Sequence, residues 1–376
     1  MLFTNAAVFF AGSGFAPASF RVENGVYAEF LPPDVKEQGA VDLQGACVIP
    51  GLIDIHTHGN SGEDFSDGDY EGLKKMAAFL ARRGVTGFAP ASMTLPYEVL
   101  ERAFACAKRL HDEAPEDCAR LLGVNMEGPF FSEKKKGAQN AAYLRDPDFE
   151  AFRKLYDGCG GLVRIVDVAP ELPGAADFIA KASALCTVSV AHTDADYEEA
   201  RAAYGAGATH LTHLFNAMPP IHHRKPGVIG AASEDPNVYA ELICDGQHVH
   251  ASAVRMAFRL FPGRICLISD ALRCCGMPDG QYELGGQDVF LAGGVARLAD
   301  GTIAGSAATL FDCVQTAISF GVDRDEVIRS ATLNPAKQLG CADRYGSIEA
   351  GKQADFLVCD ADLNLKQVFL GGRPLA

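Results

Sequence analysis

Short apolar segments alternate with amphipathic, helix-like segments through the middle of the chain. The apolar segments span residues 51–58, 85–90, 121–127, 163–170, 187–192, 208–213, 239–245 and 265–270. Continuously apolar strands that alternate with helices are typical of a parallel sheet buried on both faces. Eight strand–helix units in about 220 residues predict an α/β fold, a (β/α)₈ barrel of the TIM type.

A doubly wound open sheet is the alternative for such an alternation. That fold commonly carries a G-x-G-x-x-G turn directly after its first strand, where it binds a dinucleotide. The residues after the first strand here are Gly59-Asn60-Ser61-Gly62-Glu63, which lack that pattern. The barrel is therefore the favoured arrangement.

The two ends of the chain have a different sequence pattern from the middle. Short apolar runs separated by turns fill residues 1–50, and Asn24-Gly25 between two of them is a hairpin signal. The runs 354–360 and 365–370 look alike. We expect the ends, 1–50 and 343–376, to form one small β-sandwich domain, with the barrel at 51–342 inserted between them.

Composition limits the classes of partner. The net charge of −15 argues against non-specific binding to nucleic acid and against an acidic membrane surface. No apolar run reaches the roughly 18 residues of a membrane span. Twelve cysteines without a C-x-x-C pair or a recognisable signal peptide predict a reducing, cytoplasmic location.

Residues that ligate metals stand at the carboxyl ends of five of the predicted strands. They are His56 and His58 after the first strand, Glu127 after the third, His192 after the fifth, His213 after the sixth and Asp270 after the eighth. Side chains of barrel enzymes meet at this rim. Four imidazoles and two carboxylates can hold one or two divalent ions, and zinc, iron, cobalt and manganese all accept such ligands. His210 lies deeper in its strand, and we interpret it as structural.

A divalent ion at this rim predicts hydrolytic chemistry. The ion lowers the pKa of a bound water molecule and polarises a carbonyl group. A carboxylate beside it can accept the proton of that water and pass it to a leaving amine. Asp270 is the candidate for this role and Glu127 for the principal carboxylate ligand, so the ligand set predicts metal-assisted hydrolysis of an amide-like bond.

These motifs resemble the amidohydrolase superfamily, and within it the N-acetylglucosamine-6-phosphate deacetylase family. The H-x-H alone is common to the superfamily, whereas E-G-P with H-L-F-N-A-M is more specific. The matching segments follow one another along nearly the whole chain, at 50–59, 125–129, 212–218, 224–227, 244–249, 269–271, 305–306, 331–336 and 350–355.

The resemblance implies removal of the N-acetyl group from N-acetylglucosamine 6-phosphate, giving glucosamine 6-phosphate and acetate. It assigns a metal to Glu127, His192 and His213 and the general base to Asp270, and members that keep the H-x-H can hold a second ion. The substrate-binding residues that it implies for the sugar phosphate are Asn216, Ala217, Arg224 and His248. Because that arginine comes from the neighbouring subunit in the family, the resemblance also implies a homodimer.

One position departs from the family pattern. Gln139 stands where many members have a histidine that positions or polarises the substrate. Glutamine can donate a hydrogen bond to a carbonyl but carries no charge, so the sugar could instead be another N-acetylamino sugar phosphate, of the galactosamine type. A cyclic-amide hydrolase is a further alternative, but many of those use a carboxylated lysine, and neither the third nor the fourth strand ends in lysine.

Overall fold

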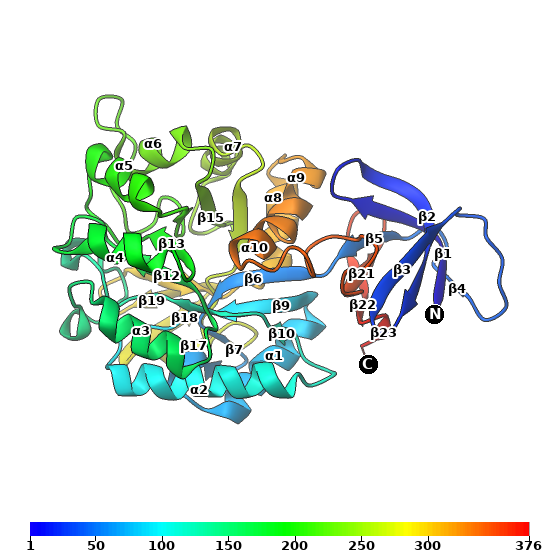
Figure 1. The fold of residues 1–376 in the computed structure, drawn as a ribbon, viewed down its shortest axis with the longest axis horizontal. Coiled ribbons are helices and arrows are strands. Elements are labelled where there is room, and N and C mark those ends of the chain that lie inside the picture. The colour runs from blue at the N-terminus through cyan, green and yellow to red at the C-terminus, as the bar shows by residue number, and fades with distance from the viewer. Residues whose placement is uncertain (376) are drawn as a thin grey trace.

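The computed structural model describes residues 1–375, which form a barrel and a smaller β domain beside it (Figure 1). The barrel strands run parallel, and their order around the barrel follows the chain. They are β6 (Leu52–Thr57), β9 (Val85–Pro90), β11 (Val124–Met126), β12 (Val163–Val168), β13 (Thr187–Val190), β14 (His210–Leu211), β15 (Tyr239–Ile243) and β16 (Ile265–Ile268), with the short β10 (Arg120–Leu121) pairing with β9. The predicted (β/α)₈ fold is confirmed.

The barrel closes between its last and first strands. The Asp270 N–H donates to the His56 carbonyl at 2.9 Å, and the Ser269 hydroxyl donates to Asp54 Oδ2 at 2.6 Å. Burial raises the pKa of Asp54 to about 6, although Ser269 and backbone N–H groups favour the ionised form. The closing contacts therefore lie within two residues of the predicted metal ligands.

Helices connect the strands and cover the outside of the barrel (Figure 1). They are α1 (Tyr70–Arg82), α2 (Tyr97–Glu113), α3 (Phe149–Gly158), α4 (Ala175–Ala182), α5 (Tyr197–Ala206), α6 (Gly227–Glu234), α7 (Ala251–Leu260), α8 (Leu310–Ser319), α9 (Arg324–Ser330) and α10 (Leu333–Gln338). Asp69, Asp148, Asp196 and Asp323 accept N–H groups at the starts of α1, α3, α5 and α9, which fixes where those helices begin. Helix α6 lies between β14 and β15, after the proline-containing loop of residues 219–226. No helix of residues 1–375 is long and apolar enough to span a membrane.

Short elements shape the loops at the carboxyl rim. After β6 come β7 (Gly59–Asn60), β8 (Glu63–Asp64) and η1 (Phe65–Asp67), and after β11 come η2 (Glu133–Lys135) and η3 (Ala141–Tyr143). A four-stranded antiparallel sheet follows β16, formed by β17 (Gly280–Leu284), β18 (Gln287–Ala292), β19 (Val295–Leu298) and β20 (Ile303–Ser306). The Ser306 N–H donates to the Asp270 carbonyl at 2.8 Å, so this sheet returns to the rim of the barrel.

The two chain ends pair in one eight-stranded sheet, as the sequence suggested. Its strands are β1 (Leu2–Phe10), β2 (Gly14–Glu23), β3 (Val26–Leu31), β4 (Val41–Asp42), β5 (Cys47–Pro50), β21 (Phe356–Cys359), β22 (Leu365–Leu370) and β23 (Arg373–Pro374). Strands β5 and β21 join the two ends antiparallel, and a bridge between Val26 and Gln353 connects β3, at the far edge of the sheet, with the segment that precedes β21. Phe3, Phe20 and Phe356 pack in the core of this folded sheet.

Gly51, between β5 and β6, allows the two units to approach closely. Its N–H donates to the Asp355 carbonyl at 2.9 Å, and a Cβ there would lie 2.0 Å from Thr86 Oγ1.

We expect Gly51→Ala to lower the free energy of unfolding by about 1–3 kcal/mol, because buried Thr86 has no room to move away. Denaturant unfolding measures this effect. Gly12→Ala is the matched control, since nothing lies within 4 Å of a Cβ at that exposed glycine; equal losses in both variants would contradict the explanation.

Candidate metal centre

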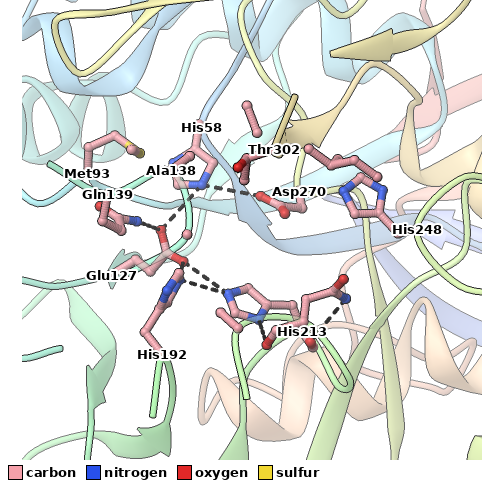
Figure 2. A pocket seen from close by; sticks show the side chains of 16 residues that line it. His58, Met93, Glu127, Ala138, Gln139, His192, His213, His248, Asp270 and Thr302 are labelled. Carbon is pink, nitrogen blue, oxygen red and sulfur yellow. Dashed lines mark hydrogen bonds and ion pairs between the residues drawn. The ribbon is translucent and has the colours of Figure 1, made fainter. Parts of the chain in front are cut away.

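The carboxyl ends of the barrel strands bring all six predicted metal ligands together. Figure 2 shows Glu127 between His192 and His213 on one side and His58 on the other, with Asp270 facing His58. Glu127 Oε1 lies 3.0 Å from His192 Nε2, 3.3 Å from His213 Nε2 and 3.5 Å from His56 Nε2, and Oε2 lies 3.4 Å from His58 Nε2.

Two groups of possible ligands share the Glu127 carboxylate. One contains His56, His58 and Glu127, and the other contains Glu127, His192 and His213. Asp270 Oδ1 lies 3.3 Å from His58 Nε2 and 3.8 Å from His56 Nε2, on the side of the first group. The geometry thus provides for one or two ions, with Glu127 as the ligand common to both.

Hydrogen bonds fix the orientation of each imidazole ring. The Nδ1 atoms donate to oxygens: His56 to Glu241 Oε2 at 2.9 Å, His58 to the Ala91 carbonyl at 3.2 Å, His192 to the Lys135 carbonyl at 2.9 Å and His213 to the Asn216 carbonyl at 3.2 Å. A carbonyl can only accept, so the proton is on Nδ1 and the Nε2 lone pair faces the centre. The buried Nε2 of His56 has no hydrogen-bond partner within the described chain. These residues therefore fit a nitrogen- and oxygen-ligated divalent ion.

The charges at the centre also favour a cation. Burial by itself would raise the pKa of Glu127, but His56, His192 and His213 outweigh it and hold that pKa well below its usual value. Burial likewise opposes ionisation of Asp270, and His58 more than compensates, so its pKa is lowered. Both carboxylates are ionised at neutral pH, as ligation and proton acceptance require.

The backbone bends sharply where the ligands leave their strands. His192, His213 and Asp270 have φ values of 44°, 27° and 48°, in the left-handed region that residues other than glycine seldom adopt. Each of these conformations costs on the order of 1–3 kcal/mol and persists only where the surrounding structure enforces it. This strain at three ligand positions is what one expects where side-chain placement matters more than local stability.

Glu241, on β15, is a residue of the centre that the sequence did not reveal. Its Oε2 accepts from His56 Nδ1 and from the His213 N–H at 3.2 Å, and its Oε1 lies 3.2 Å from His210 Nε2. His210, interpreted from the sequence as structural, is buried and also contacts Gln338. Burial would raise the pKa of Glu241, but the two histidines lower it, so an ionised carboxylate orients His56 from beneath.

The predicted substrate residues divide into those that line the cavity above the ligands and one that does not. Gln139, Asn216, Ala217 and His248 line this cavity of about 160 Å³. Gln139 donates to Glu127 Oε2 at 2.7 Å and accepts from the Thr94 N–H at 2.8 Å, so its amide contacts the carboxylate that the two ligand groups share. Arg224 is exposed, contacts His223 and does not line the cavity of its own chain.

Other residues near the cavity were not predicted. Asp245 accepts from His248 Nδ1 at 2.7 Å and thereby orients that ring, and the D-x-x-H spacing of the two residues was the available signal. Residues 302–305, around β20, line the cavity from the inserted sheet. Asp167, buried on β12, has its pKa raised well above the usual value by burial and then by Glu241 and Glu127.

Known proteins resemble this chain in sequence and in fold. The model of the amidohydrolase family matches residues 47–375, and the chain belongs to that family. It is 37% identical to an N-acetylglucosamine-6-phosphate deacetylase of Vibrio furnissii (93% of this chain, 88% of that protein). It is 36% identical to an N-acetylgalactosamine-6-phosphate deacetylase of Escherichia coli O157:H7 (94% and 93%). The structure of a mutant N-acetyl-D-glucosamine-6-phosphate deacetylase from Mycobacterium smegmatis, in complex with N-acetyl-D-glucosamine-6-phosphate, superimposes with a TM-score of 0.93 at 34% identity, over 100% of this chain and 99% of that one.

Glu241→Gln tests whether this carboxylate supports the metal ligands. The neutral amide is a weaker acceptor for His56 and presents N–H groups to a neighbouring imidazole, so we expect affinity for a divalent ion to fall about 10–100-fold. Competition titration with a zinc chelator measures that affinity. Glu234→Gln, which changes an exposed carboxylate on α6 that contacts Tyr197, is the control. Equal zinc affinity in both variants would show that Glu241 does not act through His56.

Proposed function

We propose that this enzyme hydrolyses the acetamide bond of N-acetylglucosamine 6-phosphate, releasing acetate and glucosamine 6-phosphate. The observation that carries the proposal is the cluster of Glu127, four Nε2 atoms and Asp270 at the base of a cavity. Relatives of this chain that are named as deacetylases of amino sugar 6-phosphates support this choice of substrate class. Amide hydrolysis needs an electrophile activator and a base, and the cluster offers both.

The residues of the chain have distinct parts in this reaction. A divalent ion held by the glutamate and histidines would supply a Lewis acid that activates water and polarises the amide carbonyl. Asp270, ionised and at the cavity wall, accepts a proton from the attacking water. It then returns that proton to the amine nitrogen as the carbon–nitrogen bond breaks. Gln139 lines the same cavity and holds Glu127 in position, so the absence of a histidine there does not leave Glu127 unsupported.

The phosphate end of the substrate has separate candidates. Asn216, Ala217 and His248 line the cavity, and Asp245 favours the protonated form of His248, whose pKa is raised although burial opposes this. Arg224 stands on an exposed loop with His222, His223 and Lys225. We propose that this loop reaches the cavity of a second subunit in a homodimer, because no arginine or lysine of the described chain lines its own cavity.

The ion itself is proposed to be zinc, iron, cobalt or manganese, one or two per subunit. His192 and His213 with Glu127 would hold the first, and His56 and His58 the second.

We also propose a reducing compartment such as the cytoplasm for this protein. The twelve cysteines are all free thiols, which supports that location.

Release of acetate from a panel of sugars tests the function directly. We expect hydrolysis of N-acetylglucosamine 6-phosphate and much slower release from unphosphorylated N-acetylglucosamine, with bound metal measured on the same sample. Because one relative is named for the galactosamine substrate, N-acetylgalactosamine 6-phosphate is included; a higher kcat/KM for it would assign that epimer instead. If a metal-loaded sample released no acetate from any of the phosphorylated sugars, the proposal would be overturned.

Asp270→Asn tests the general base. We expect the bound metal to remain while kcat falls about 10²–10⁴-fold, because the amide cannot accept the proton. Acetate release and metal analysis by mass spectrometry are measured together. Asp288→Asn, on the exposed face of β18, is the control and should be fully active. Undiminished turnover of the Asp270 variant would exclude it as the base.

Arg224→Ala tests the contact with phosphate. We expect KM to rise at least about tenfold for the phosphorylated sugar and to change little for the unphosphorylated one, since only the former has a group for arginine to bind. Steady-state kinetics on both sugars give the comparison, with Arg259→Ala, an exposed arginine on α7, as control. An equal rise in KM for both sugars would argue against phosphate binding by Arg224.

A further inference from the structure

A second cavity, of about 280 Å³, lies at the other end of the barrel from the metal centre. Its wall includes residues at or near the amino ends of β10 and β12 and residues that follow α10. Figure 1 shows β10 and α10 at the end of the barrel that faces the small β domain. The basic residues of its lining are His111, Arg120, Arg164 and Arg344. We name this space the arginine cavity.

The charge of the arginine cavity is opposite to that of the whole chain. Among the described residues that line it are three arginines and a histidine but no aspartate or glutamate, although the chain has 48 acidic residues and a net charge of −15. Within residues 1–375, neither Arg164 nor Arg344 forms an ion pair with a carboxylate. Two arginines without acidic partners, in a protein that is acidic as a whole, attract an anion.

Part of each arginine side chain is held by its surroundings. Arg120 Nε lies 3.1 Å from Asp355 Oδ2. The stem of Arg164 crosses over Gly123, where a Cβ would lie 2.3 Å from Arg164 Cγ. The guanidinium of Arg344 lies 5.1 Å from the ring centre of Tyr345. Restrained arginines lose less conformational freedom when they bind an anion, and their planar groups can each make two hydrogen bonds to a phosphate.

The rest of the lining is largely apolar. Leu110, Leu121, Leu122 and Leu339 contribute to the wall, together with Tyr345. His111 donates Nδ1–H to the Leu121 carbonyl at 2.7 Å, which leaves Nε2 available to a ligand. The volume is too small for a macromolecular segment of any length and suits a compact ligand that carries both an anionic and a carbon-rich part.

We propose that the arginine cavity binds a phosphate monoester of a small metabolite, with the phosphate between Arg164 and Arg344 and the carbon-rich part against the leucines. Arg120 forms the wall nearest the small domain through its ion pair with Asp355, which precedes β21. The site shares no lining residue with the metal-centre cavity in the described chain, so it is separate from the substrate site.

A crystal soaked with tungstate, a phosphate analogue located by its anomalous scattering, tests the position of the site. We expect an anomalous peak within hydrogen-bond distance of Arg164 and Arg344, in addition to any peak at the metal centre. Peaks confined to the metal centre would overturn the proposal. The experiment requires no turnover, so its outcome is independent of whether the enzyme deacetylates amino sugars.

Isothermal titration calorimetry of the metal-loaded enzyme tests binding in solution, with inorganic phosphate and phenyl phosphate as probes. We expect the double variant Arg164→Ala/Arg344→Ala to lose one binding event per chain and the Arg259→Ala control to keep it. The exposed arginines can be removed without opening the core, and thermal unfolding checks this. Phenyl phosphate should bind about tenfold more tightly than phosphate at this site, because its ring would bury apolar surface. Identical titrations of wild type and double variant would overturn the proposal.

Discussion

The candidate metal centre depends on one shared carboxylate, Glu127, surrounded by imidazoles from three other strands. A buried carboxylate is costly unless charges or hydrogen-bond donors face it. Here the imidazoles that face it come from residues as distant along the chain as His56 and His213, so the arrangement exists only when the barrel is closed. The contact between β16 and β6, where Asp270 N–H meets the His56 carbonyl, is therefore a condition for assembling the site as well as for closing the fold.

A layer of polar residues inside the barrel connects these two conditions. Asp54 accepts the Ser269 hydroxyl across the closing seam, and Glu241 orients His56 while contacting the backbone of His213. The polar groups that close the barrel are thus neighbours of those that orient the side chains of the candidate ligands. The strained backbone at His213 and Asp270 is held by the same surroundings, since the His213 N–H donates to Glu241 and the Asp270 N–H to the His56 carbonyl.

The sequence predicted what depends on pattern and position. Continuous apolar strands identified the barrel, and because parallel strands end on one rim, the six candidate ligands could be grouped from their places along the chain. Helix α6 has only a weak sequence signal, because Gly227–Glu234 follows a proline-rich loop and contains two glycines and the β-branched Val228 and Ile229. Glu241 was missed because one acidic residue in an apolar strand has no local signal. The Gln139–Glu127 contact arises from the folding of a loop, which spacing alone does not encode.

The way the small domain is assembled bears on how the protein is made. Strand β5 pairs with β1 early in the chain, but its other neighbour, β21, is synthesised about 300 residues later, which takes on the order of 15–60 s at ordinary rates of translation. During that interval the edge of β5 is open beside the ribosome, and open strand edges invite unwanted pairing. Completion of this sheet is then a late event of biosynthesis, so the nascent chain's need for chaperones should be concentrated at its amino-terminal strands rather than in the barrel that carries the chemistry.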